Sequence, residues 1–134
     1  MSIVDWSSDY SINNSIIDSQ HQRLFDIVNN LHLALLDHDK RHDAVSVALD
    51  ELFDFSKTHF AEEERQMEAA NFPGLGEHRD AHAALRQKIL EFQDHLSKEE
   101  PVSLGADLLG FLISTWLFSH VLGIDKKFAH YLKH

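Results

Sequence analysis

The sequence predicts an all-α protein, an up-down-up-down antiparallel four-helix bundle with an extended N-terminal arm. Apolar residues recur at intervals of three and four along four segments, 18–38, 41–70, 76–97 and 103–132, which is the spacing of one helix face. No segment shows a convincing two-residue alternation. Turn-rich breaks at HDKRHD, NFPGLG and SKEEPVS separate the segments, and such short connections suit antiparallel neighbours.

The arm comprises residues 1–17 and shows no periodicity, although it carries Trp6, Tyr10 and Ile12. These apolar side chains are expected to pack across the bundle. Asp18 is the expected N-cap of the first helix, because a carboxylate can accept hydrogen bonds from the free N–H groups of the first turn.

The fourth segment raises an alternative, since residues 108–124 contain no Asp, Glu, Lys or Arg and nearly reach membrane-spanning length. A histidine within the segment and three plainly amphipathic companion helices favour a buried bundle helix instead. We therefore expect no membrane partner.

Composition narrows the function further. The 134 residues suit a single domain, and a formal charge of −10 disfavours nucleic acids and anionic surfaces as partners. Because the chain has no cysteine, a metal would have to bind nitrogen and oxygen ligands. The N-terminal MSIVDWSSDY lacks the features of a signal peptide, so we expect a cytoplasmic protein.

The eleven histidines can be sorted on a helical wheel at 100° per residue. His21 in the first helix and His59 in the second fall on the apolar faces. Among the carboxylates of HFAEEE, Glu63 lies about 40° from His59 and faces inward. Glu62 is marginal at about −60° and Glu64 lies about 140° away, and both are expected on a solvated face.

The third and fourth helices add three inward histidines. His78 and His82 in EHRDAH lie one turn apart on the apolar stripe, and His120 shares its face with Trp116 and Leu117. One inward histidine usually hydrogen-bonds a backbone carbonyl. Five of them with a carboxylate predict a metal site, because each unpaired buried polar group costs about 1–3 kcal/mol and a shared cation satisfies them all.

These motifs resemble those of the bacterial hemerythrins, four-helix bundles with a non-haem di-iron site that binds dioxygen. The resemblance spans essentially the whole chain through the tryptophan-bearing arm, DSQHQRLF, HFAEEE, PGLGEHRDAH and WLFSHVLGID. It departs at Asn13 and Asn14, where the family usually has a glycine and an apolar residue; asparagine tolerates positive φ, so the turn should survive. The resemblance implies seven metal ligands: His21, His59, Glu63, His78, His82, His120 and Asp125.

The implied cofactor is two iron ions with a bridging oxide or hydroxide. With the two carboxylates bridging as well, one coordination position stays open on the iron held by His21 and His59. An apolar lining would exclude water from that position. The candidate lining residues are Leu24, Phe25, Phe55, Ile113, Trp116 and Leu117.

His120 and Asp125 lie five residues apart, which places them about 140° apart on an α-helix. If both face one centre, the helix must widen, and we predict a π-type or irregular turn near Gly123. Phe111, Phe118 and Leu122 lie opposite His120 on the wheel, where they either pack against the arm or form a patch for a partner subunit.

The expected function is reversible dioxygen binding for storage, buffering or delivery, and not catalysis, because two carboxylates among neutral imidazoles favour carriage over oxidation. The recipient would be an oxygen-consuming enzyme or a signalling partner, and the chain is expected to be a monomer, with a weak dimer as the alternative. Three alternatives stay open: an oxygen- or redox-sensing module, a di-iron enzyme acting on peroxide or nitric oxide, and a zinc-loaded or metal-free bundle. The other histidines are expected to lie outside the site: His32, His38, His42, His95, His130 and His134.

Overall fold

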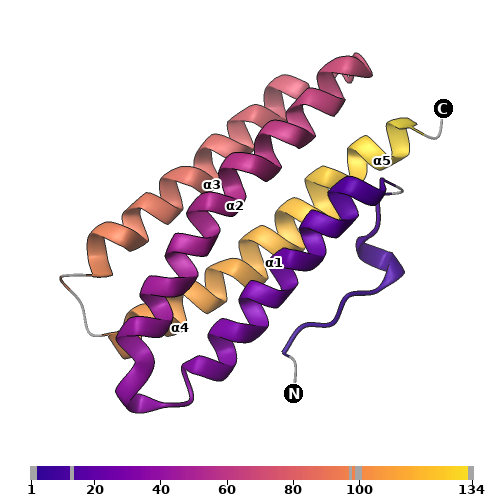
Figure 1. Ribbon diagram of the computed structural model, residues 1–134. Coiled ribbons are helices and arrows are strands. Elements are labelled where there is room, and N and C mark those ends of the chain that lie inside the picture. The colour runs from indigo at the N-terminus through magenta and orange to yellow at the C-terminus, as the bar shows by residue number, and fades with distance from the viewer. Residues whose placement is uncertain (1–2, 13, 97, 99–100, 133–134) are drawn as a thin grey trace.

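Four long helical segments lie antiparallel and enclose one main core in the computed structural model, which describes residues 3–12, 14–96, 98 and 101–132 (Figure 1). No strand occurs within these ranges, and the predicted four-helix bundle is confirmed. The elements are η1 (Ser8–Tyr10), α1 (Ser15–Ala34), η2 (His38–Lys40), α2 (Arg41–Ala69), α3 (Leu75–Leu96), α4 (Pro101–Phe111), η3 (Leu112–Asp125) and α5 (Lys126–Leu132).

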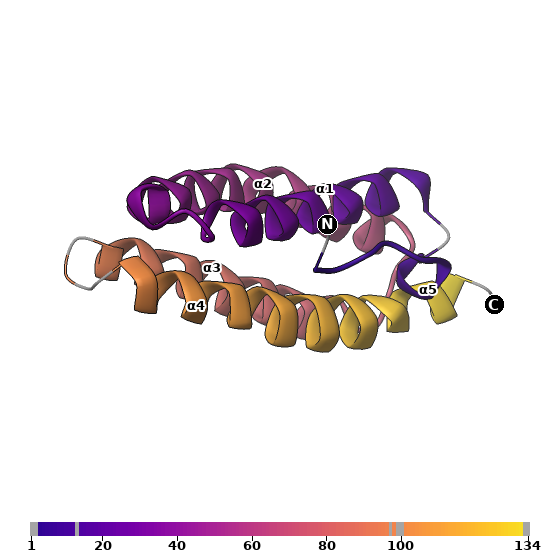
Figure 2. The same ribbon diagram turned by 90° about the horizontal axis from the view of Figure 1, so that it is seen from below.

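The helices form two layers, α1 with α2 and α3 with the continuous α4–η3–α5 segment (Figure 2). The turn from α2 to α3 depends on Asn71, whose φ of 56° places it in the left-handed region. This conformation lets the N–H of Phe72 return to the carbonyl of Met67 at 2.9 Å, which satisfies a free carbonyl at the helix end. The chain then reverses and packs α3 against α2.

The start of α1 differs from the prediction. Asn14 is the N-cap, and its side chain accepts hydrogen bonds from two backbone N–H groups of the first turn, both at 3.1 Å. The prediction that Asp18 caps the helix is wrong, because Asn14 supplies the extended backbone and the acceptor earlier. Asp18 instead fastens the arm: it accepts hydrogen bonds from the hydroxyl of Ser11 at 2.6 Å and the N–H of Ile12 at 2.9 Å.

The arm packs along α1. The rings of Trp6 and Tyr10 stack with centroids 5.8 Å apart, and both meet Phe25 edge-on, at 5.4 Å and 4.5 Å. Asn29 clamps the start of the arm by accepting from the N–H and donating to the carbonyl of Val4. The arm thus packs against the buried Phe25 of α1, and its η1 turn also contacts η3.

The fourth helical segment widens between α4 and α5. Residues of η3, Leu112–Asp125, form a π-helix, in which each N–H bonds five residues back and one turn takes more residues than in an α-helix. The predicted turn near Gly123 is therefore confirmed as part of a longer π segment. In this geometry Leu112, Trp116, Val121 and Asp125 all stay buried, at intervals of four and five residues.

The described residues test only in part the predicted packing of Phe111, Phe118 and Leu122 and the predicted turn at Asn13. Phe111 is half-buried and meets Trp116 with ring centroids 6.3 Å apart, so it packs inside the bundle. Leu122 is also half-buried. The side chain of Phe118 and the turn at Asn13 lie outside the described part of the chain.

One helical stretch, Leu104–Ala129, is long and apolar enough to cross a membrane by length and composition, with 35% of its most apolar window buried. Its buried side carries His120 and Asp125. Among its described side chains, the exposed positions include Ser114, Thr115 and Ser119, which suit water better than lipid. The stretch is therefore read as a core helix of the bundle.

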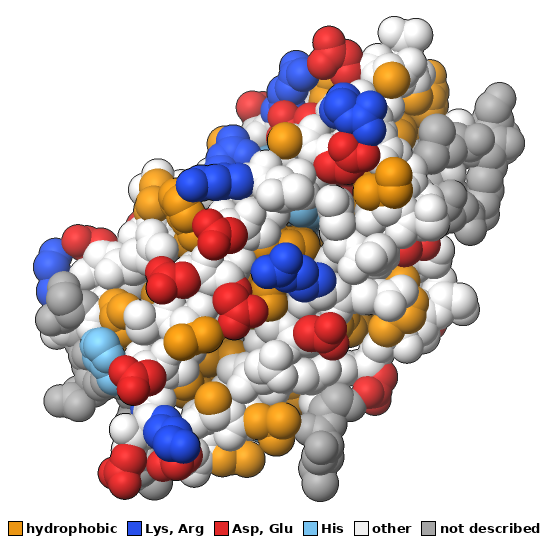
Figure 3. Space-filling view, in the orientation of Figure 1, with side chains coloured by type: hydrophobic (Ala, Val, Ile, Leu, Met, Phe, Trp, Pro, Cys, Tyr) orange, Lys and Arg blue, Asp and Glu red, His pale blue; other side chains and the backbone are white. Residues whose placement is uncertain are grey.

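Acidic and basic side chains are interspersed on the face shown in Figure 3, with apolar patches between them. The exposed large apolar residues come from several elements: Ile3, Ile16, Leu33, Leu36, Val47, Leu90 and Tyr131. Scattered apolar residues of this kind are normal on a soluble surface.

Candidate metal centre

The seven predicted ligands come together in the core. Each of these residues is at most 2% exposed: His21, His59, Glu63, His78, His82, His120 and Asp125. All four helical segments contribute, since α1 supplies one, α2 two, α3 two and η3 two of them. The bundle therefore gathers residues that lie far apart in the chain.

The ligands form two overlapping groups whose potential ligand atoms lie within 4.8 Å of one another. The three-histidine half contains His78, His82 and His120, and the two-histidine half contains His21 and His59. Glu63 and Asp125 belong to both groups. Two carboxylates common to two groups are the arrangement needed to bridge a pair of metal ions.

Distances in the three-histidine half fit neighbouring ligands of one octahedral ion. His78 Nε2 lies 2.6 Å from Glu63 Oε1 and 2.7 Å from Asp125 Oδ1. His82 Nε2 lies 3.0 Å from Glu63 Oε1, and His120 Nε2 lies 3.1 Å from Asp125 Oδ1. Ligands bound at about 2.1 Å on adjacent corners would be about 3 Å apart.

The two-histidine half uses the other oxygen of each carboxylate. His21 Nε2 lies 3.1 Å from Asp125 Oδ2 and 3.4 Å from Glu63 Oε2, and His59 Nε2 lies 3.3 Å from Glu63 Oε2. The two imidazole Nε2 atoms are 3.1 Å apart. Each carboxylate thus directs one oxygen to each half, as a bridging ligand does.

Several of these polar atoms have no hydrogen-bond partner although they are buried. They are His21 Nδ1, Glu63 Oε2, both ring nitrogens of His120 and both carboxylate oxygens of Asp125. Unpaired buried groups of this kind each cost about 1–3 kcal/mol. Cations at the two groups would satisfy the carboxylate oxygens and His120 Nε2, so the residues present fit a two-metal centre.

Burial and the neighbouring charges shift the pKa values of the histidines and carboxyl groups in the site. Burial opposes protonation of His21, but Asp125 and Glu63 beside it raise its pKa to about 10. The same balance raises the pKa of His78 to about 9. Burial dominates at His59 and lowers its pKa. Burial also opposes ionisation of the two carboxyl groups, but the surrounding imidazoles outweigh it and lower the pKa of each.

Two contacts behind the ligands were missed by sequence reasoning. The prediction that Glu64 faces solvent is wrong, because its side chain reaches across to α3 and places Oε2 2.7 Å from His82 Nδ1. Gln20 Oε1 lies 2.7 Å from His59 Nδ1. Their position next to a ligand in the chain was the available signal. Glu62 is half-buried and pairs with the exposed Arg65.

Aromatic rings flank both halves. Phe55 stacks on His59 with centroids 4.9 Å apart, and Phe60, which the helical wheel did not single out, stacks on His82 at 4.0 Å. Trp116 contacts both phenylalanines, and its indole N–H is buried without a partner.

The predicted lining residues are placed as follows. Phe55, Trp116, Leu24, Phe25 and Leu117 are buried, whereas Ile113 is half-buried. The ring of Phe25 turns toward the arm. Their role around a bound ligand remains a prediction.

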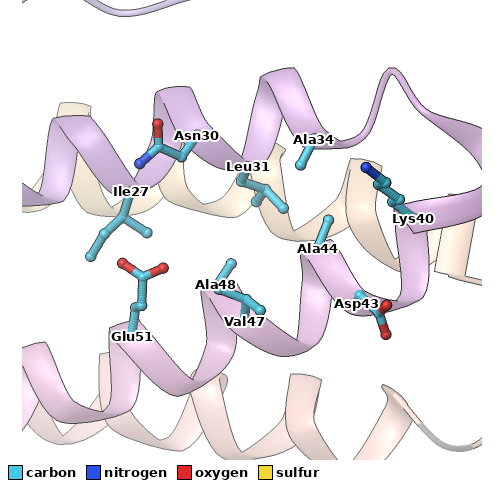
Figure 4. A pocket seen from close by; sticks show the side chains of 10 residues that line it. All are labelled: Ile27, Asn30, Leu31, Ala34, Lys40, Asp43, Ala44, Val47, Ala48 and Glu51. Atoms are coloured by element: carbon cyan, nitrogen blue, oxygen red, sulfur yellow. The ribbon is translucent and has the colours of Figure 1, made fainter.

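Two hollows on the surface bear on whether the site can be reached from solvent. A hollow of about 220 Å³ reaches the site and is lined by Gln20, Arg23, Asp54, Phe55, Thr58 and His59. A larger apolar groove of about 300 Å³ lies between α1 and α2 beside Ile27, Leu31 and Val47 (Figure 4). None of the seven predicted ligands lines that groove.

Of the remaining histidines, those whose side chains the structure describes fall outside both groups. His32 is half-buried, and His42 and His95 are exposed. His134 and the side chains of His38 and His130 are outside the described part of the chain.

Comparison with known proteins is consistent across sequence and structure. Residues 13–132 match the family model of the hemerythrin HHE cation binding domain. The chain is 32% identical to a bacteriohemerythrin of Stenotrophomonas maltophilia (strain R551-3), with 99% of this chain and 84% of that protein aligned. It is 30% identical to the myohemerythrin of Riftia pachyptila, with 92% and 88% aligned.

A solved structure extends the comparison to the fold. The crystal structure of a hemerythrin point mutant superposes with a TM-score of 0.80 and 22% identity, and all of both chains is covered. This similarity independently supports the bundle. Together with the family match over residues 13–132, the sequence identities lead to one conclusion: the chain belongs to the hemerythrin family.

Proposed function

We propose that the chain binds dioxygen reversibly at a non-haem di-iron centre and thereby stores, buffers or delivers oxygen in the cytoplasm. The observation that carries this proposal is the sharing of Glu63 and Asp125 between two groups of histidines. Relatives named hemerythrin and bacteriohemerythrin support oxygen binding at such a site.

The donor set favours iron and carriage. Imidazole and carboxylate ligands suit iron, and the five imidazoles are neutral when they bind a metal. When bound, the irons supply the electrons that hold dioxygen and recover them on its release. Glu63 and Asp125 contribute the only two anionic side chains among the seven ligands, so the site has little anionic charge with which to favour highly oxidised iron.

The chain's own residues would exclude water and hold the ligands still. Phe55 and Phe60 cover one face of His59 and His82, and Trp116 closes the space between the two phenylalanines. An apolar surround that excludes water slows side reactions between the bound group and solvent. Delivery implies an oxygen-consuming enzyme as recipient, and we expect the carrier to act as a monomer.

Metal analysis with an optical spectrum tests the proposal. The chain is expected to contain about two irons, a number that follows from two complete ligand groups. Anaerobic reduction followed by exposure to air should give a long-lived coloured oxygenated form that reverses when oxygen is removed. Fast bleaching with turnover of peroxide would favour an enzyme, and a chain that binds no iron would contradict the proposal.

A further inference from the structure

Two of the five site histidines have their outward ring nitrogen held by a side chain, one in each half. His59 Nδ1 lies 2.7 Å from Gln20 Oε1, and His82 Nδ1 lies 2.7 Å from Glu64 Oε2. By contrast, two other rings of the site leave Nδ1 buried without a partner. The outward contacts are therefore selective.

Both contacts follow the same arrangement. Two residues adjacent in the chain each contact one of the two nitrogens of a single histidine ring. Glu64 faces His82 Nδ1 while Glu63 Oε1 lies 3.0 Å from His82 Nε2. Gln20 faces Nδ1 of His59, and its neighbour His21 meets Nε2 of that ring at 3.1 Å. An acceptor at Nδ1 fixes the ring proton there and leaves the Nε2 lone pair for a metal.

The two outer partners differ in charge. The amide of Gln20 offers a neutral dipole, whereas the carboxylate of Glu64 is an anion that draws the Nδ1 proton outward and makes the His82 ring a stronger electron donor. Arg79 also lies 3.3 Å from Glu64, but its side chain is 50% exposed, so solvent screens that ion pair. Contact with the fully buried ring of His82 is therefore the stronger interaction.

We propose that Gln20 and Glu64 are positioning residues that make the two metal sites unequal. Glu64 strengthens metal binding in the three-histidine half and stabilises the oxidised ion there. Gln20 orients His59 without adding charge, so the two-histidine half keeps the weaker-held and more readily reduced ion. This inference rests on the proposed di-iron function and specifies how its two sites are tuned.

Titration of the metal-free chain with Co²⁺, followed by visible absorbance, tests the inequality. Glu64→Gln keeps the size and the hydrogen-bond acceptor but removes the charge. It should lower the affinity for one of the two ions about tenfold, the lower end of the range for such outer partners. Gln20→Glu adds charge on the other side and should tighten the second ion. Glu62→Gln is the matched control, because Glu62 pairs with Arg65 and Gln66.

A second readout isolates each ring. In the Zn²⁺-loaded chain, ¹⁵N NMR should show one protected Nδ1–H for His59 and one for His82, with the latter further downfield. Glu64→Gln should move only the His82 signal. In the iron-loaded chain the same variant should raise the reduction potential of one iron, an effect that a purely structural role would not produce.

The outcomes separate this inference from the function beneath it. Equal effects of Glu64→Gln and Glu62→Gln on Co²⁺ affinity would show a general charge effect and overturn the inference. Movement of both Nδ1–H signals together would do the same. In either case, a wild-type chain that still binds two Co²⁺ would leave the proposed function standing, whereas failure to bind two ions would contradict that function itself.

Discussion

The two halves of the metal centre are built from different parts of the molecule. The two-histidine half lies on the layer of α1 and α2, whereas the three-histidine half takes its ligands from α3 and the π segment η3. Glu63 comes from the first layer and Asp125 from the second, and each reaches both halves. The halves thus differ in ligand number but share their anionic charge.

This difference shows how a bundle makes two neighbouring sites unequal without a second domain. By the proposed ligand count, an open position exists only in the half with two histidines, and a charged outer partner lies behind His82. The backbone contributes as well, because the π-helix lets His120 and Asp125 face the centre together. Inequality therefore arises from the ligands, from their outer contacts and from the local helix geometry.

The largest effect is expected from Asp125→Ala, which removes one of the two carboxylates that both groups share. Affinity for both metal ions should fall by more than about 100-fold, because each ion loses an anionic ligand. Metal analysis after equilibrium dialysis measures the loss. Asp107→Ala, an exposed change in α4, is the control, and an Asp125 variant that still binds two ions tightly would refute the bridging role.

Single-histidine variants should separate the halves. His59→Ala leaves its half with one histidine, and the chain should retain about one metal ion. His120→Ala leaves two histidines in its half, and both ions should remain, one of them held at least about tenfold less tightly. Metal-to-chain ratios with His32→Ala as control test this order. Equal loss in both variants would show that the halves do not bind independently.

The metal-free chain should lose stability as pH rises. His21 and His78 have pKa values of about 10 and about 9 when folded, against 6.5 in the unfolded chain. Their stabilising contribution is therefore full below pH 6.5 and disappears as pH rises through 9 to 10, a loss on the order of a few kcal/mol. Urea denaturation at pH 7 and pH 10 after metal removal measures it.

The metal-loaded chain is the comparison for that titration, because ligated imidazoles carry no proton at the metal-binding nitrogen. Its stability should change much less over the same pH range. Metal uptake at pH 7 should also release protons, detectable by calorimetry in buffers of different ionisation enthalpy. A metal-free chain whose stability rises between pH 7 and pH 10 would contradict the charge balance described for the two halves.

The smallest effect is expected from the arm. Asp18→Ala removes the acceptor for Ser11 and Ile12, and the free energy of unfolding should fall by about 1–2 kcal/mol. Metal stoichiometry should be unchanged, because none of the arm residues that the structure describes belongs to either candidate ligand group. Thermal unfolding with Asp26→Ala as control measures the change, and a loss of metal in either half would show that the arm shapes the centre directly.

The sequence by itself determined the helical segments and the inward histidines. Apolar spacing at three and four residues is a local property, so the bundle and the faces of His59, Glu63, His78 and His82 could be read from it. The prediction of a widened turn near Gly123 needed the family resemblance as well, because only the resemblance implied that Asp125 faces the same centre as His120. The N-cap of α1 was predicted at the wrong residue because Asn14 and Asp18 both carry good hydrogen-bond acceptors. Only the backbone conformation decides which of the two caps the helix.

Only the tertiary structure decided the contacts between helices. The wheel assigned Glu64 to solvent because it fixes the direction of Cα–Cβ, whereas the long side chain bends across to a ring on α3. Gln20 against His59 and Phe60 against His82 depend equally on which helix lies alongside. A helical wheel represents a single helix, whereas these contacts depend on the distance and the relative rotation of two neighbouring helices.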